Sequence, residues 1–190
     1  LEEEFKSNRI FAHKYEFSGG YGINLMYEVS RYALIAGAFA STESFDLIHA
    51  HDWLTYPAGI AAKKISGKPL VIHVHATEFD RTGENVNPAV YEIEKSGMEE
   101  ADYIIAVSDL TRNTIIQKYN IHPDKVFTVH NGVDVQLEER SQQIERPIPE
   151  KIVTFLGRIT YQKGPEYFVE VARRILRVDD NVRFVMAGSG

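Results

Sequence analysis

The chain has 190 residues, with 27 acidic side chains against 21 basic ones, a net charge of −6 and no cysteine. This composition excludes a disulfide framework and a thiol nucleophile, and it argues against bulk electrostatic binding to nucleic acid or to an anionic membrane. No apolar run reaches the roughly 20 residues that a membrane-spanning helix needs. The start, LEEEFKSNR, lacks the apolar core of a signal peptide. We therefore expect a cytoplasmic protein without a transmembrane segment.

Up to residue 130, short apolar runs between turn residues alternate with apolar positions at helical spacing. The predicted order is helix 24–40, strand 45–50, helix 57–66, strand 70–74, loop 75–83, helix 88–100, strand 102–107, helix 109–119 and strand 126–130. Asn24, Asn87 and Ser108 are expected N-caps, and Gly67 is an expected C-terminal stop. Strands that alternate with helices predict an α/β fold with a parallel sheet flanked by helices.

Residues 136–150 are polar, contain two prolines and show no periodicity, which is typical of a linker. A single βαβ unit follows, with strand 151–156, loop 157–164, helix 165–178 and strand 182–187. We therefore predict a partial first domain over 1–135, a linker over 136–150 and the start of a second domain over 151–190. The chain has no initiator methionine, so we expect it to be an excised piece or a processed product.

Polar side chains gather where three predicted strands end. The groups are His49, His51 and Asp52; His73, His75 and Glu78; and Asn131 with Asp134. Ligands of open α/β sheets bind outside the carboxyl ends of the strands. Side chains alternate along a strand, so His73 and His75 share a face. If these strands are neighbours, the sequence predicts a pocket edged with imidazole and carboxylate groups.

Two other interpretations of these residues stay open. The simpler one is that they are ordinary loop polars with one or two core histidines. The other is a metal-dependent hydrolase that uses His49, His51, His73 and His75, because His-x-His pairs suit zinc or manganese. Spacing alone is a weak indication, and no third element fixes a ligand set.

The stretch Gly157–Pro165 lies between a predicted strand and a helix start. Its glycines allow close backbone approach, the helix N-terminus favours an anion, and Arg158 and Lys163 add charged donors. It is neither a Walker A loop nor a Gly-x-Gly-x-x-Gly fingerprint. The stretch can serve as a diphosphate cradle; the alternative is a solvated loop with two surface cations.

Several motifs occur in one order along the chain: HAHDW, HVHATEFDR, VSDLTRNTIIQKYNIHPDKVFTVHNGVD, GRITYQKGPEYFVEVA and AGSG. Together they resemble the retaining glycosyltransferases of the glycogen/starch synthase-like superfamily, of family 4 or 5 type. The resemblance covers about residues 18–190. It implies a GT-B fold, with two Rossmann-like domains of which the first holds the acceptor and the second the nucleotide-sugar donor.

The resemblance also implies the roles of single residues. His75 would lie beside the transferred sugar. Arg158, Lys163, Gly164 and Gly188 would bind the donor. The acceptor side and the cleft would be formed by His51, Asp52, Trp53, Glu78, Asn131 and Asp134. The implied reaction moves a hexosyl group from a nucleoside diphosphate to an acceptor hydroxyl with retention, and no cofactor and no metal ligands are implied.

The chain departs from the family in three ways. It lacks the glycine-rich loop after the first strand, the second half of the donor domain with its glutamate pair, and the helix that braces the first domain. We therefore expect little turnover from these residues alone. A single βαβ unit exposes a sheet edge, so a self-associating, non-catalytic binding module is an alternative. Nucleotide, sugar and acceptor are not determined by the sequence.

Overall fold

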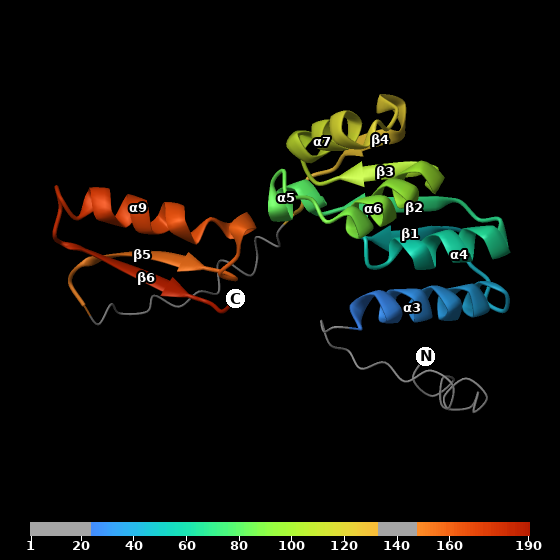
Figure 1. Cartoon of the computed structure of the whole chain (residues 1–190), viewed down its shortest axis with the longest axis horizontal. Helices are drawn as coiled ribbons and strands as arrows, with labels where there is room; N and C mark the ends of the chain where they lie inside the picture. The colour runs from blue at the N-terminus through green and yellow to red at the C-terminus, as the bar shows by residue number, and fades with distance from the viewer. Residues whose placement is uncertain (1–23, 133–147) are drawn as a thin grey trace. The chain divides into compact units, whose positions relative to one another are not determined.

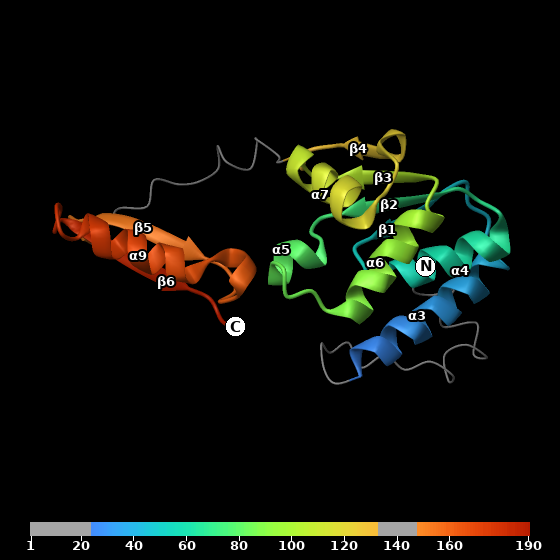
Figure 2. The same ribbon diagram turned by 45° about the horizontal axis from the view of Figure 1, so that its top comes forward.

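The computed structural model describes residues 24–132 and 148–190. These residues fall into two compact units, which Figures 1 and 2 show from two directions. Within the described residues, the first unit comprises 24–77 and 88–130, and the second comprises 78–87, 131–132 and 148–190. Asp134 and most of the predicted linker 136–150 lie outside the described residues.

The first unit is built on a four-stranded parallel sheet in the order β1-β2-β3-β4. Its strands are β1 (Ile48–His51), β2 (Leu70–Val74), β3 (Tyr103–Ala106) and β4 (Val126–Thr128). In the register, His51 lies opposite His73, and Ile72 lies opposite Ile104. The predicted α/β class and parallel pairing are confirmed.

Four helices accompany this sheet: α3 (Leu25–Ala40), α4 (Tyr56–Ser66), α6 (Pro88–Glu100) and α7 (Asp109–Tyr119), with a 3-10 turn η1 (Pro123–Lys125) before β4. Gly67 ends α4 in the left-handed conformation, with φ of 68°. Ser108 caps α7, because its side chain accepts a hydrogen bond from the Thr111 amide. Asn24 stands at the N-cap of α3, but its side chain makes no capping hydrogen bond. Figure 1 shows α3 lying along α4.

The core lies between the helices and one face of the sheet. Leu70, Ile72 and Ile104 have no exposed surface. The close approach of α4 is visible at Gly59, where an added Cβ would lie 2.8 Å from Leu70 Cδ1 and 3.0 Å from Ala50 Cβ. Side chains alternate between the faces of a strand, so the opposite face carries a different set. Those side chains include the exposed His49, His51, Tyr103 and Phe127.

The sequence prediction was wrong about the loop 75–83. Residues Glu78–Thr82 form a short helix, α5, in which Thr82 Oγ1 donates to the Glu78 carbonyl. Gly83 follows with φ of 65°. Five residues are too few to display a helical period, so nothing in the apolar pattern could reveal this helix. Strands β3 and β4 are also shorter than predicted, within the usual uncertainty of element ends.

The second unit pairs β5 (Lys151–Leu156) with β6 (Val182–Ala187) in parallel, and α9 (Pro165–Ile175) connects them after the 3-10 turn η2 (Tyr161–Lys163). Phe168 of α9 lies 5.6 Å from both Phe155 and Phe184, measured between ring centroids, so these rings join helix to sheet. The predicted bounds of both strands are confirmed, while the helix ends at 175 instead of 178. Among the helices described, none has the length and apolar character of a membrane-spanning segment.

Candidate active site

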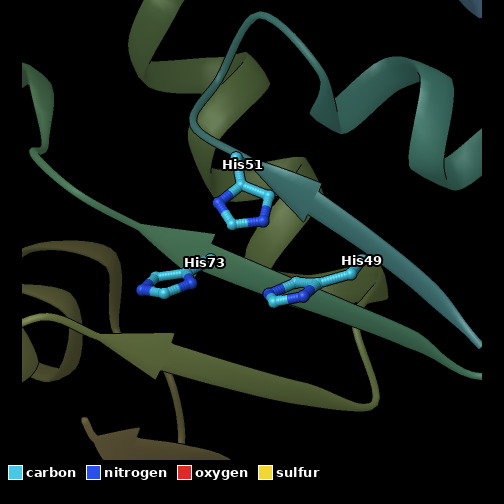
Figure 3. A group of neighbouring side chains, drawn as sticks. All are labelled: His49, His51 and His73. Carbon is cyan, nitrogen blue, oxygen red and sulfur yellow. The ribbon is translucent and has the colours of Figure 1, made fainter. Parts of the chain in front are cut away.

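Strands β1 and β2 place four imidazole rings on one face of the first sheet. Adjacent ring centroids lie 4.3 Å apart for His49 and His51, 4.9 Å for His51 and His73, and 4.4 Å for His73 and His75. Figure 3 shows three of these rings above the strands. His49 and His73 lie inside their strands, whereas the sequence placed them with the groups at the strand ends. The predicted shared face of His73 and His75 agrees with their stacking at 15°.

Asp52 fixes the turn that follows β1. Its φ is 56°, a left-handed conformation that Asp tolerates better than most residues. Asp52 Oδ1 accepts from the His75 amide at 2.8 Å, and the Asp52 amide donates to the His73 carbonyl at 3.0 Å. His51 Nδ1 lies 3.0 Å from His75 Nε2. The fold therefore brings together His51, Asp52 and His75, three of the residues singled out in the sequence.

The surroundings of His49 and His73 favour their neutral imidazole forms. Burial lowers the pKa of His49, and the neighbouring His51 and His75 lower it further. Burial is also the largest cause that lowers the pKa of His73. The three other histidines lower this pKa further, while the Asp52 carboxylate raises it. A second positive charge would be repelled by the first, and so His49 and His73 resist protonation. A neutral imidazole keeps one nitrogen lone pair free to accept a proton or bind a ligand.

The remaining residues predicted for the cleft have different surroundings. Trp53 is half-buried in the turn before α4, and Asn131 is exposed after β4. Glu78 is buried; its Oε1 accepts from the Asn87 amide at 3.2 Å, and its Oε2 lies 3.7 Å from Arg81. Glu78 thus holds α5 to the chain that follows it. The cleft roles of Trp53, Glu78 and Asn131 stay predictions, and Asp134 lies outside the described residues.

In the second unit, the loop after β5 exposes both predicted cations, Arg158 and Lys163. The loop tightens through η2, where the Lys163 amide donates to the Thr160 carbonyl at 3.0 Å. Gly164 then takes φ of 61° and opens α9, with Pro165 in its first turn. The free amides of a helix's first turn and the positive end of its dipole favour an anion. Lys163 therefore precedes a helix start by two residues, as predicted.

Gly188 allows two loop backbones to touch. An added Cβ would lie 1.8 Å from the Gly157 carbonyl oxygen, so no other residue fits without movement. The Gly157 amide donates to Ala187 O at 3.1 Å, and the Ile159 amide donates to Ser189 O at 3.0 Å. The end of β6 thus braces the loop that carries Arg158.

One further polar atom of this loop escaped sequence reasoning. Thr160 Oγ1 is buried, and no group of the described ranges forms a hydrogen bond with it. Nothing in a lone threonine between an isoleucine and a tyrosine signals that position. The bracing partner Gly157 was included in the cradle, but its contact with Gly188 could not be foreseen from the separate motifs.

The sequence profile of glycosyltransferase family 4 matches residues 7–137. An uncharacterized glycosyltransferase of Methanocaldococcus jannaschii is 34% identical over 161 residues, which is 78% of this chain and 41% of that protein. The alpha-maltose-1-phosphate synthase of Mycolicibacterium smegmatis is 31% identical, over 70% of this chain and 38% of that protein. The chain thus spans about two fifths of the length of these curated relatives.

Solved structures share the fold. The Anabaena protein Alr3699/HepE in complex with UDP-glucose has a TM-score of 0.63 at 17% identity, over 84% of this chain and 43% of that one. A sucrose-phosphate synthase from Thermosynechococcus elongatus has a TM-score of 0.59 at 16% identity, over 87% of this chain and 51% of that one. The predicted fold of the GT-B type is confirmed. Since the family profile matches well over half of the sequence, the chain belongs to glycosyltransferase family 4.

Proposed function

We propose that the whole protein transfers a hexosyl group from a nucleoside-diphosphate sugar to an acceptor hydroxyl, with retention at the anomeric carbon. The observation that carries the proposal is the family match over residues 7–137. The relatives named above are themselves called a glycosyltransferase and a synthase of a sugar phosphate, and one structural neighbour holds UDP-glucose.

The leaving group of this reaction is a nucleoside diphosphate, on which negative charge grows as the glycosidic bond breaks. Preorganised donors stabilise such charge. In our proposal Arg158 and Lys163 are these donors. Gly164 opens the helix whose N-terminus faces the phosphate, and Gly188 keeps the Arg158 loop in place. The exposure of both cations and the left-handed Gly164 support this assignment.

The first unit would hold the sugar and the acceptor. His75 is assigned to the transferred sugar, because its backbone is fixed by Asp52 and its ring by His51. A ring held by neighbours loses little further entropy when a substrate binds. The acceptor side and the cleft are assigned to His51, Asp52 and Trp53 of the first unit, together with Glu78, Asn131 and Asp134, which lie outside it.

The decisive experiment compares Lys163→Ala with Arg177→Ala in the complete gene product, assayed with UDP-, ADP- and GDP-glucose. Arg177 is an exposed cation near the end of α9, away from the helix start. Loss of Lys163 should lower kcat/KM roughly ten- to a hundredfold, because a hydrogen bond to a charged group contributes about 1.5–3 kcal/mol. Arg177→Ala should change it less than about twofold. Equal rates for wild type and Lys163→Ala would refute the phosphate assignment.

Retention is tested separately by proton NMR of the first product, in which the anomeric coupling distinguishes the two configurations. A product with the donor's configuration supports the proposal, and an inverted product refutes that part of it. The same spectra address the hydrolase alternative at His49, His51, His73 and His75. Hydrolysis would release free sugar without an acceptor, whereas transfer requires one.

A further inference from the structure

The four-histidine face of the first sheet has a capacity that glycosyl transfer does not use. One ring nitrogen from each of His49, His51 and His73 lies within 4.8 Å of the other two. Figure 3 shows the three rings converging from two neighbouring strands. We propose that these three imidazoles bind one divalent transition-metal ion of the zinc, nickel or copper class. The site does not depend on the proposed function.

The separation of the nitrogens suits a small ion after a slight closure. In a tetrahedral zinc centre with Zn–N bonds of about 2.0–2.1 Å, two ligand nitrogens are about 3.4 Å apart. The parallel pairing of His51 with His73 fixes the backbone distance, and His49 lies two residues before His51 on the same face. The nitrogens, now within 4.8 Å of one another, would have to approach to about 3.4 Å, and we assign this closure to rotation of the side chains.

His73 has an unmet requirement that a metal would satisfy. Neither of its ring nitrogens is exposed, and neither has a hydrogen-bond partner among residues 24–132 and 148–190. Buried polar atoms normally have partners. A metal ion bound at one of these nitrogens would supply one.

His75 is placed to orient one ligand of the same site. A metal-binding histidine commonly donates its other ring N–H to a nearby acceptor, which fixes its tautomer and its orientation. His51 Nδ1 lies 3.0 Å from His75 Nε2. If the proton resides on His51 Nδ1, the His51 Nε2 lone pair is left for the ion. The role of His75 here is positioning.

The chemistry of the donors selects the metal. Three imidazoles favour zinc, nickel and copper, while magnesium and calcium prefer oxygen ligands. His49 and His51 are exposed, so an ion can reach them from solvent. Three ligands leave a fourth position for water. Sequence reasoning looked for a third element to complete a ligand set, but two adjacent strands are sufficient.

The test titrates Zn²⁺ and Co²⁺ into the untagged chain. Calorimetry should give one Zn²⁺ per chain, and Co²⁺ should develop the intense visible absorption of a tetrahedral nitrogen site. In NMR spectra of the wild type, the ring signals of His49, His51 and His73 should shift on adding Zn²⁺, while those of His122 and His130 should not. This measurement needs no variant, so it stands even where a substitution impairs folding.

Variants provide the second arm. Loss of a residue that only hydrogen-bonds to a metal ligand costs about 10–100-fold in metal affinity. Loss of the ligand His51 itself, in His51→Asn, should therefore weaken Zn²⁺ binding at least about tenfold. His122→Asn, at an exposed histidine in the turn before β4, is the matched control and should bind like the wild type. The proposal is overturned if Zn²⁺ binding is not saturable, if the His122 or His130 signals shift instead, or if a folded His51→Asn binds as tightly as the wild type.

Discussion

At the scale of single residues, one carboxylate oxygen joins three elements of the first unit. Asp102 Oδ2 accepts from the Leu70 amide at the start of β2 and from Lys63 Nζ of α4, at 2.7 Å and 2.9 Å. Lys63 Nζ also donates to the Glu100 carbonyl at the end of α6. The hydrogen bond from the Leu70 amide, then that from Lys63, lowers the pKa of Asp102 below 3.8. This group therefore links stability to pH.

The folded protein should lose the contribution of Asp102 in acid. Because the folded pKa lies below the unfolded one, the unfolded chain takes up the proton first. The stabilisation is thus present above the ordinary pKa of an aspartate and is lost as the pH falls through the lower folded pKa. We expect Asp102→Asn to lower the urea midpoint more at pH 7 than at pH 3, as followed by Trp53 fluorescence. Asp46→Asn, at an exposed aspartate, is the control; an equal loss at both pH values would contradict the linkage.

Gly188 gives a second prediction at this scale. Gly188→Ala would drive a methyl group into the Gly157 carbonyl at 1.8 Å. Overpacking of this kind costs about 1–3 kcal/mol. Each 1.4 kcal/mol changes the equilibrium constant for opening this contact roughly tenfold. Amide hydrogen exchange at Gly157 should accelerate accordingly. An alanine Cβ at Gly132 would have no neighbour within 4 Å among the described residues, so Gly132→Ala should leave that exchange rate unchanged. Equal effects of the two substitutions would disprove the close contact.

At the scale of elements, α7 depends on its cap. Ser108 Oγ accepts from the Thr111 amide at 3.1 Å and lies 2.9 Å from Thr111 Oγ1. Ser108→Ala should cost about 0.5–2 kcal/mol of the free energy of unfolding, because an amide of the first turn loses its acceptor. Urea unfolding followed by Trp53 fluorescence measures the loss. Ser108→Asp, which retains an acceptor, should recover most of it, and a failure to do so would count against the capping role.

Helix α6 offers a case in which two effects oppose each other. Replacing a helical glycine by alanine normally stabilises a helix by about 1 kcal/mol. At Gly97, however, the new Cβ would lie 2.5 Å from Tyr56 Cδ2 and 2.8 Å from Tyr56 Cβ. Tyr56 is 1% exposed, and its Cβ is bonded to the backbone, so a change of side-chain rotamer cannot move this atom away from the new methyl group. The clash, about 1–3 kcal/mol, should therefore prevail.

We expect Gly97→Ala to lower the urea midpoint, while Ser96→Ala, at the exposed neighbouring position, should leave it unchanged or raise it slightly. A stabilised Gly97→Ala protein would show that α6 has room to move away from Tyr56.

At the scale of the whole molecule, the second unit exposes apolar surface. Phe155 of β5 and Phe184 of β6 contact Phe168 of α9. Side chains alternate along a strand, so the neighbours of each phenylalanine in its strand point to the face of the sheet away from α9. On that face Ile152 is 43% exposed and Val185 44%. Exposed apolar patches commonly mark surfaces that bind other proteins.

We therefore predict self-association, which the exposed sheet edge of a single βαβ unit raised above as an alternative. Light scattering coupled to size exclusion should show a mass that rises with concentration. Val185→Lys should reduce the rise, because a charge is costly to bury in an apolar contact, and Lys68→Glu, at an exposed site in the first unit, should not. A monomer at every concentration would refute the expectation.

The sequence by itself determined the order of elements, and the physical reason is local. Pro57, Gly67 and Ser108 act within a few residues of themselves, so α4 and α7 were predicted almost to the residue. The bounds of β5 and β6 followed from apolar runs between turns in the same way. The helix α5 was missed because five residues carry no period.

Only the tertiary structure decided which of the polar residues meet. Strand register is set by packing across the whole sheet, and it alone placed His51 opposite His73 and so united His49 with His73. The same holds for Asp102, 32 residues from the amide of Leu70 that it binds, and for Gly188 against Gly157. Contacts between distant residues depend on how the elements stack, and that information is not contained in any short stretch of the chain.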